Sequence, residues 1–268
     1  MMENIFNPNK RYYPLGSGFG RAFENFRDAH ILLWAALLAV IVVLINAMGL
    51  QTQANPKDLA LAGTFCAGTI IAVLFQILIS FKMVGAAMKK AGLKLAEPLP
   101  KMESWVVLQI RIAILEISSW YDKKLLAASI ALLILAVLAG AITQTPQLMP
   151  LLLLPIYLIM FVNQVRLMFG NYYFLQGEGN DAQMPKKSYE FVQGQTMQVA
   201  LPMIFIMALS IFVSLLYSAI PADGMMIFIH MFLMFIVSWL LAAFSAALMA
   251  DVFKFFNQAQ KKKPAKGE

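Results

Sequence analysis

The stretch Leu125–Ile142, LLAASIALLILAVLAGAI, contains no charged residue. A helix that crosses the hydrocarbon core of a bilayer needs about 20 mainly apolar residues, and it satisfies its own backbone hydrogen bonds. Two further runs without charge are Ile31–Ile45 and Leu148–Val162. A transmembrane β-strand would instead alternate polar and apolar residues over about ten positions. The unbroken runs therefore predict helices that span a membrane.

The amino-acid composition supports this class. The 268 residues are 60% hydrophobic and 13% charged, whereas soluble domains are about 45–50% apolar and about 25% charged. The formal net charge is +7, but the basic residues lie beside the apolar runs rather than in one patch. This placement is typical of membrane topology signals, so we expect no nucleic-acid partner.

Residues that commonly bind metals and cofactors are scarce. Cys66 is the only cysteine, and His30 and His230 are the only histidines. One thiol forms neither a disulfide nor a thiolate metal site within the chain, and zinc and haem sites usually need more of these ligands. We therefore predict no metal and no cofactor, and we interpret Cys66 as a small packing residue.

We predict an all-α fold: a polytopic transmembrane helical bundle of six spans in three hairpins, with cytoplasmic interfacial helices. The predicted spans are residues 31–50, 59–83, 125–142, 148–170, 199–220 and 225–253. They form a membrane domain, 31–256, between an N-terminal cytoplasmic segment, 1–30, and a basic cytoplasmic tail, 257–268. The spans of each hairpin are joined by short polar turns, at 51–58, 143–147 and 221–224.

The positive charges indicate the orientation of this bundle. Of the 21 Lys and Arg residues, only Lys57 falls on the side of the short turns. Cytoplasmic loops of membrane proteins carry an excess of Lys and Arg. We therefore expect both termini and the two long connections between hairpins to be cytoplasmic.

A short amphipathic segment is predicted before each hairpin. The three segments are residues 18–30, 104–124 and 186–198. In the first, Phe19, Phe23 and Phe26 follow the i, i+4, i+7 spacing of one helix face, while the charged residues lie elsewhere. An interfacial helix requires this pattern, because one face contacts lipid and the other contacts water.

The segment Ser104–Trp120 leaves two interpretations open. As a further span it would bury Arg111 and Glu116, at about 2.5–3.5 kcal/mol for each charge near the centre of the membrane. It would also make the number of spans odd. We therefore interpret the segment as an interfacial helix, and insertion into the membrane is the alternative.

The stretch Lys186–Gln195, KKSYEFVQGQ, places Ser188 and Tyr189 ahead of Gly194, just before the fifth predicted span. An aromatic amphipathic helix also runs into the first span over Gly18–Leu33. In this pattern the chain resembles the six-span membrane domain of the glycerophosphoryl diester phosphodiesterase family and its stand-alone YciC-type relatives. The resemblance implies their architecture and a bacterial inner membrane. It carries over no catalytic residues, because nothing in the chain resembles the soluble catalytic barrel of these enzymes.

Polar residues within or beside the spans are the candidate functional positions, because charge is costly in lipid. Asn163, Gln164 and Arg166 form a polar cluster at the end of the fourth span, where Arg166 suits a phosphate or the ends of helices. His230 lies about one turn into the sixth span, where it suits an interhelical hydrogen bond or a proton or ligand role. We expect Asp251, near the inner end of that span, to be solvated at the interface or to pair with the lysine three residues later.

The sequence contains no recognisable acid pair, no nucleophile with its base and no phosphate-binding loop, so we predict that the protein is not an enzyme. We hypothesise a non-catalytic inner-membrane protein that organises the envelope or acts as a membrane-embedded partner or assembly factor. Its partners would be the lipid bilayer and other membrane proteins or a second copy of the chain. The alternative is a small transporter or channel subunit that uses Asn163–Arg166 and His230. A third hypothesis, a lipid-modifying enzyme, would require an acid or histidine pair near a headgroup.

Overall fold

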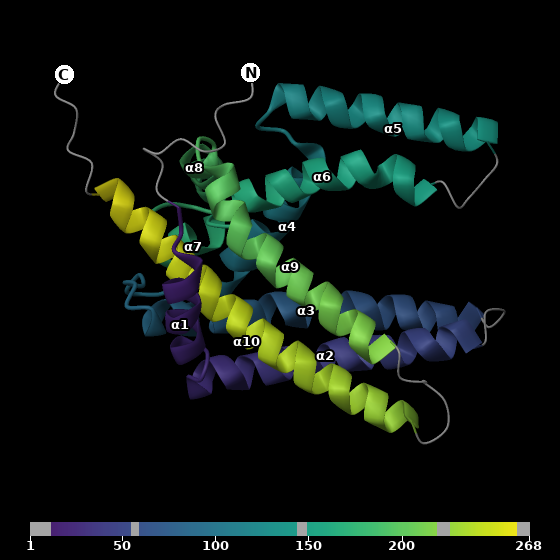
Figure 1. Cartoon of the computed structure of the whole chain (residues 1–268), viewed down its shortest axis with the longest axis horizontal. Helices are drawn as coiled ribbons and strands as arrows, with labels where there is room; N and C mark the ends of the chain where they lie inside the picture. The colour runs from purple at the N-terminus through teal and green to yellow at the C-terminus, as the bar shows by residue number, and fades with distance from the viewer. Residues whose placement is uncertain (1–11, 55–58, 144–148, 219–225, 262–268) are drawn as a thin grey trace. The chain divides into compact units, whose positions relative to one another are not determined.

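The computed structural model describes residues 12–54, 59–143, 149–218 and 226–261, and the side chains of 12–49, 52, 59–135, 153–216 and 226–258. All regular secondary structure in these ranges is helical, so the predicted all-α class is confirmed for them. The helices labelled in Figure 1 are α1 (Leu15–Asn25), α2 (Ala29–Ala54), α3 (Leu59–Lys90), α4 (Met102–Ser118), α5 (Lys123–Thr143), α6 (Met149–Leu167), α7 (Gly170–Leu175), α8 (Gln183–Val192), α9 (Thr196–Ser218) and α10 (Met226–Lys261).

Five segments are long and apolar enough to cross a membrane: Ala29–Gly49, Leu59–Lys90, Leu153–Leu175, Thr196–Leu216 and Met226–Gln258. Each overlaps a predicted span, so the chain has the helices of an integral membrane protein. The remaining predicted span, 125–142, coincides with α5, but the side chains of α5 beyond residue 135 lie outside the described residues. The count of six spans therefore stays a prediction. All or part of each predicted short turn, and residues 262–268 of the tail, also lie outside the description.

Side-chain caps explain where two boundaries differ from the sequence-based ranges. Asp28 Oδ1 accepts a hydrogen bond from the His30 backbone N–H, 3.0 Å away, so α2 begins at Ala29 and the preceding amphipathic helix ends at Asn25. Asn180 Oδ1 likewise accepts from the backbone N–H groups of residues 182 and 183 and starts α8 early. Such caps satisfy N–H groups that have no partner in the first turn of a helix.

The described residues divide into two compact units, and the division falls within α9. The central unit is residues 96–200, which hold α4 to α8 and the first residues of α9. The terminal unit combines 12–95 with 201–261, which hold α1 to α3, the rest of α9 and α10.

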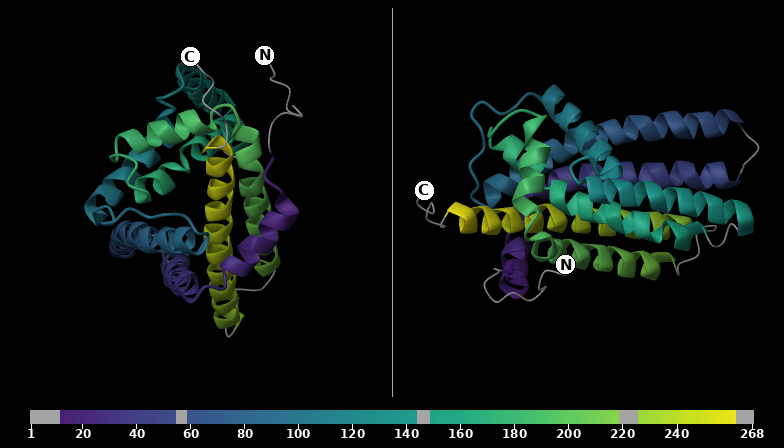
Figure 2. Two further views of the ribbon diagram at one scale, coloured as in Figure 1. Left: turned by 90° about the vertical axis from the view of Figure 1, so that its left-hand side faces the viewer. Right: turned by 90° about the horizontal axis from the view of Figure 1, so that it is seen from above.

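In the terminal unit α2 packs against α3, and α10 packs on α1, α2 and α3. Both views of Figure 2 show α2 and α3 side by side. Buried alanines on α2 and α10, such as Ala35 and Ala243, allow helix backbones to approach closely. The Trp239 indole N–H donates a hydrogen bond of 2.8 Å to the Leu32 carbonyl and joins the two helices. Within the described part of the chain, α10 therefore packs more closely on α2 than on α9, its expected hairpin partner.

In the central unit α6 packs on α4, α5 and α8, and α7 packs on α8. Large apolar side chains fill its core, among them Trp105, Phe169 and Met184, each almost fully buried. The Trp105 and Phe174 rings lie 6.1 Å apart, and the Phe169 and Phe191 rings lie 5.8 Å apart. The aromatic residues after the fourth predicted span, which the sequence suggested for the membrane interface, are therefore buried in this core.

The predicted helix at 104–120 is α4, which is apolar on two faces. One face buries Trp105, Leu108 and Ile112 in the central unit. The opposite face leaves large apolar side chains exposed: Val107, Ile110, Ile114 and Ile117. The helix has 17 residues, fewer than the roughly 20 that a span usually requires. The choice between an interfacial and an inserted helix stays a prediction.

Candidate functional site: an apolar groove and two polar clusters

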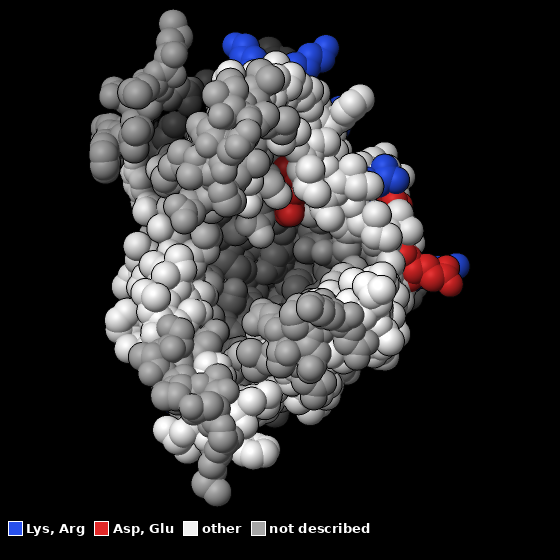
Figure 3. Space-filling view, turned by 90° about the vertical axis from the view of Figure 1, so that its right-hand side faces the viewer, with Lys and Arg blue, Asp and Glu red and all other residues white. Residues whose placement is uncertain are grey.

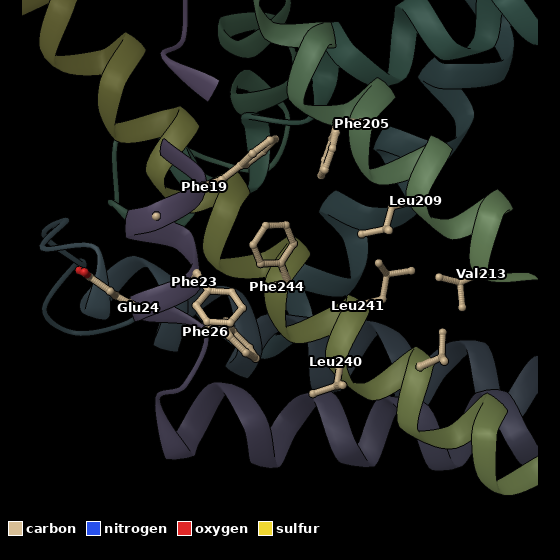
Figure 4. Close-up of a pocket in the computed structure, with 12 residues that line it drawn as sticks. Phe19, Phe23, Glu24, Phe26, Phe205, Leu209, Val213, Leu240, Leu241 and Phe244 are labelled. Carbon is tan, nitrogen blue, oxygen red and sulfur yellow. The ribbon is translucent and has the colours of Figure 1, made fainter. Parts of the chain in front are cut away.

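The terminal unit contains an apolar groove with a cavity volume of about 800 Å³ between α1, α9 and α10. Its lining residues are Phe19, Gly20, Phe23, Glu24, Phe26, Phe205, Leu209, Val213, Val237, Leu240, Leu241 and Phe244. Figure 4 shows the phenylalanines of the α1 segment facing Phe205 of α9 and Phe244 of α10. Ligand pockets in proteins usually measure about 300–1,000 Å³ and are mainly apolar, as this groove is.

Helical periodicity on three elements produces the groove. Phe205, Leu209 and Val213 recur every four residues and form one stripe along α9. The Phe19 ring lies 4.4 Å from the Phe205 ring and 6.1 Å from the Phe244 ring. The predicted phenylalanine face of the first amphipathic segment therefore exists and lines this groove. The sequence could not indicate the groove, because the other two walls come from helices about 190 residues later.

A polar cluster holds α1 to α10 beside the groove. Arg21 Nη2 lies 2.8 Å from Asp251 Oδ2, and Arg21 Nε donates to both carboxylate oxygens at 3.1 Å. The Tyr13 hydroxyl donates to Asp251 Oδ2 at 2.6 Å. Burial, followed by the hydrogen bond to Asp251, raises the pKa of the Tyr13 phenol well above its usual value. The hydrogen bond to Asp251 also raises the pKa of Arg21, so both groups stay protonated at neutral pH.

The expectation that Asp251 is solvated or pairs with Lys254 is wrong. Asp251 is only 5% exposed, because Tyr13 and Arg21 cover it. Lys254 instead donates a hydrogen bond of 2.7 Å to the carbonyl of Ala91, just after the end of α3. A charged donor suits this position, because the last carbonyls of a helix lack backbone partners.

Gly18 is required by the position of Tyr13. A Cβ at residue 18 would lie 2.3 Å from the Tyr13 ring, closer than two carbon atoms can approach. In contrast, a Cβ at Gly16, on the same helix, would meet nothing within 4 Å. The absence of a side chain at position 18 therefore lets the tyrosine reach Asp251.

The second polar cluster lies in the central unit and is centred on Arg166. Arg166 Nη1 donates to Asp122 Oδ2 at 3.3 Å and to the Tyr189 hydroxyl at 2.6 Å. Arg166 Nε donates to Thr196 Oγ1 at 3.3 Å. Ser188 Oγ donates to the Arg166 backbone carbonyl at 2.8 Å. Ser188 and Tyr189, part of the local pattern that resembles the phosphodiesterase membrane domains, thus hold α8 against α6.

Asp122 connects this cluster to the start of α5. Its Oδ1 accepts hydrogen bonds from the backbone N–H groups of Lys124 and Leu125, at 3.1 and 3.2 Å, as an N-cap residue does. Burial alone would raise the pKa of Asp122. The hydrogen bonds from Leu125, Arg166, Lys124 and Tyr189 outweigh burial and lower that pKa below its usual value.

The predicted trio Asn163, Gln164 and Arg166 does not form one site. Asn163 is buried, and its amide donates to Ser119 Oγ at 2.5 Å and to the Glu116 carbonyl at 3.1 Å. Gln164 is exposed on the other side of α6. Asn163 and Arg166 therefore hold α6 to different neighbours, α4 and α8, and this structural role is the one that their contacts support.

His230 lies near the start of α10 and is half-buried within the terminal unit. It belongs to a different unit from Asn163 and Arg166. In the part of the chain whose placement is described, no group of three His, Cys, Asp or Glu residues has the geometry to hold a metal ion. The residues of the terminal unit that do come together around a volume large enough for a ligand are those of the groove.

The chain matches no protein-family model, no curated protein and no solved structure. The likeness to the membrane domain of the glycerophosphoryl diester phosphodiesterase family therefore stays a prediction. What the residues themselves establish is an α-helical protein with five helices suited to a membrane, an apolar groove and two polar clusters that join helices.

Proposed function

We propose that this protein is a non-catalytic integral protein of a bacterial inner membrane, with cytoplasmic termini, that acts as a membrane-embedded partner or assembly factor. The observation that carries the proposal is the low burial of its spans. Only 11% to 28% of each candidate span is buried within the protein. The rest of each span is an apolar side surface that is open to lipid or to the helices of another membrane protein.

Exposed side chains on α3 and α9 illustrate this surface. Ile70 and Phe75 of α3 are 64% and 54% exposed, and Ile211 and Leu215 of α9 are 58% and 65% exposed. Figure 3 shows one face of the molecule on which uncharged residues dominate the described surface. Exposed apolar surface of this extent is typical of contact with lipid or with protein partners.

The described charged residues support a structural rather than a catalytic role. Asp251 is occupied by Tyr13 and Arg21, and Arg166 is occupied by Asp122 and Tyr189. These side chains join helices to one another. A catalytic acid or base must instead reach the proton that it transfers.

A crosslinking experiment on Cys66 tests the proposal. Cys66 is the only cysteine of the chain and is exposed on the span α3. A lipid-soluble maleimide that carries a photoreactive benzophenone would be attached to Cys66 in native membranes. After irradiation, the tagged protein would be purified in denaturing detergent and its adducts identified by mass spectrometry, with Cys66→Ser as the matched control.

We expect a reproducible adduct with one or a few membrane proteins that is missing in Cys66→Ser. Adducts with abundant membrane proteins in proportion to their amounts would reject a specific partner. Recovery of the protein alone, repeated with cysteines placed at Phe75 and Leu215, would also reject it. That result would favour the small transporter or channel subunit, and reconstituted transport assays would follow.

A further inference from the structure

The groove begins at an amphipathic helix and continues along two spans. Its α1 wall belongs to the segment before the first span, and its α9 and α10 walls lie within Thr196–Leu216 and Met226–Gln258. Along α9 the stripe from Phe205 to Val213 covers about 12 Å, because a helix rises about 1.5 Å per residue. One end of the groove therefore belongs to the polar boundary of the membrane, and the rest faces hydrocarbon.

A pair of opposite charges lies at the α1 end. Glu24 is the one ionisable residue that lines the groove. The Arg27 guanidinium carbon lies 4.7 Å from the centroid of the Phe23 ring, which also lines it. Among the ion pairs of the described residues, Arg21 and Asp28 have partners on α10 and α3, whereas Glu24 and Arg27 take part in none. Both side chains are exposed at the mouth of the groove.

We propose that this groove binds an acyl chain of a zwitterionic phospholipid. The chain lies along Phe205, Leu209 and Leu241, the headgroup phosphate contacts Arg27, and the cationic amine contacts Glu24. An anionic headgroup would satisfy only the arginine and would be repelled by the glutamate. A guanidinium and a carboxylate at the mouth of one groove therefore match a headgroup that carries both charges.

The size of the groove favours an acyl chain over a helix of another protein. A helix with side chains is about 10–12 Å across, so a length of 12 Å occupies about 900–1,400 Å³. The groove offers about 800 Å³. A slender hydrocarbon chain fits this volume and needs no polar partner from the lining, which is apolar except at Glu24.

Photolabelling with a defined lipid tests the site. The full-length protein would be reconstituted into phosphatidylcholine vesicles that contain phosphatidylethanolamine with a diazirine on one acyl chain, irradiated and mapped by mass spectrometry. Leu209→Trp and Leu241→Trp fill the groove. Leu74→Trp, on α3 at a side chain that is 47% exposed, is the matched control. Circular dichroism and gel filtration would show that each variant is folded.

We expect labelled residues to concentrate in the groove in the wild type and in Leu74→Trp. Groove labelling should be lost in both Leu209→Trp and Leu241→Trp. Labels spread evenly over all exposed span surfaces, or unchanged in folded groove variants, would overturn the proposal. A copurified peptide or protein helix in the groove would also overturn it. This readout does not depend on the Cys66 adducts, so it can fail while the partner role stands.

Two charge variants test the headgroup assignment in the same assay. Arg27→Gln should reduce groove labelling, while Lys89→Gln, an exposed basic residue of α3 away from the groove lining, should leave it unchanged. Glu24→Gln should shift the preference from phosphatidylethanolamine toward anionic phosphatidylglycerol with the same labelled chain. Equal labelling by the two lipids in wild type and Glu24→Gln would contradict recognition of a zwitterion.

Discussion

The Tyr13 hydroxyl donates a hydrogen bond of 2.6 Å to Asp251 although 238 positions separate the two residues in the sequence. With the ion pair from Arg21, this contact fixes α1 against α10. Because Phe19 and Phe23 lie on the same helix, the cluster also fixes one wall of the apolar groove. The stability of α1 and the shape of the groove are therefore linked.

Substitution of Asp251 should release α1. Asp251→Asn removes the charge that Arg21 faces, and we expect a loss of about 1–3 kcal/mol in the free energy of unfolding, because a buried polar contact is weakened. Equilibrium unfolding in detergent micelles measures this loss, and faster proteolysis within residues 12–28 would show that α1 is released. Glu190→Gln, at an exposed ion pair, should change the stability little. Equal stabilities of the two variants would contradict the role of the cluster.

The raised pKa of Tyr13 predicts a loss of stability at alkaline pH. A free tyrosine has a pKa of about 10, so above that pH the unfolded chain loses a proton that folded Tyr13 keeps. The unfolded state then binds fewer protons, and the free energy of unfolding falls as pH rises. The contribution is fully present below about pH 10. In Tyr13→Phe, unfolding measured between pH 9 and 12 should depend less steeply on pH, and an unchanged slope would refute the assignment.

Gly18→Ala and Gly16→Ala form a matched pair on one helix. The new methyl group at position 18 would overlap the Tyr13 ring, whereas at position 16 it would point into open space. We expect Gly16→Ala to stabilise α1 slightly, by up to about 1 kcal/mol, since alanine favours helix more than glycine. Gly18→Ala should instead lower the unfolding temperature and expose α1 to protease. A stabilising Gly18→Ala would show that Tyr13 can move without loss.

The helices were predictable because their signals are local. Uncharged runs such as Leu125–Ile142 and the phenylalanine spacing of Phe19, Phe23 and Phe26 lie within single helices, and each corresponds to a helix or helix face. The boundary errors were also local. At Asp28 and Asn180, cap residues outweighed the apolar pattern, and such caps could have been recognised from the sequence.

The contacts between distant helices were not predictable from a single sequence. Asp251 was assigned to the membrane surface because its neighbours in sequence end a span, yet its actual partners come from residues 13 and 21. Arg166 was grouped with Asn163 by sequence spacing, but a small difference in position around α6 directs the two side chains to different helices. Side-chain direction depends on packing, which spacing alone does not determine.

The lowered pKa of Asp122 predicts a loss of stability in acid. Below about pH 4 the unfolded chain takes up a proton that folded Asp122 does not, so its contribution is present above that pH and is lost as the pH falls through the folded pKa. Asp122→Ala should cost about 0.5–2 kcal/mol at pH 7, because α5 loses its N-cap. Unfolding from pH 7 to 2 should show the wild type and the variant converging in acid. A constant difference would contradict this assignment.

Cysteine labelling distinguishes the two interpretations of α4. In a Cys66→Ser background, Glu103→Cys and Lys123→Cys lie just inside the start and just after the end of this helix. If α4 is interfacial, a membrane-impermeant maleimide reaches both from the same side of the membrane, whereas a span places them on opposite sides. Ile114→Cys, at a side chain that is 59% exposed in the protein, should be protected in membranes and react after detergent is added. Rapid labelling of Ile114→Cys in intact membranes would show that the apolar face of α4 meets water rather than lipid.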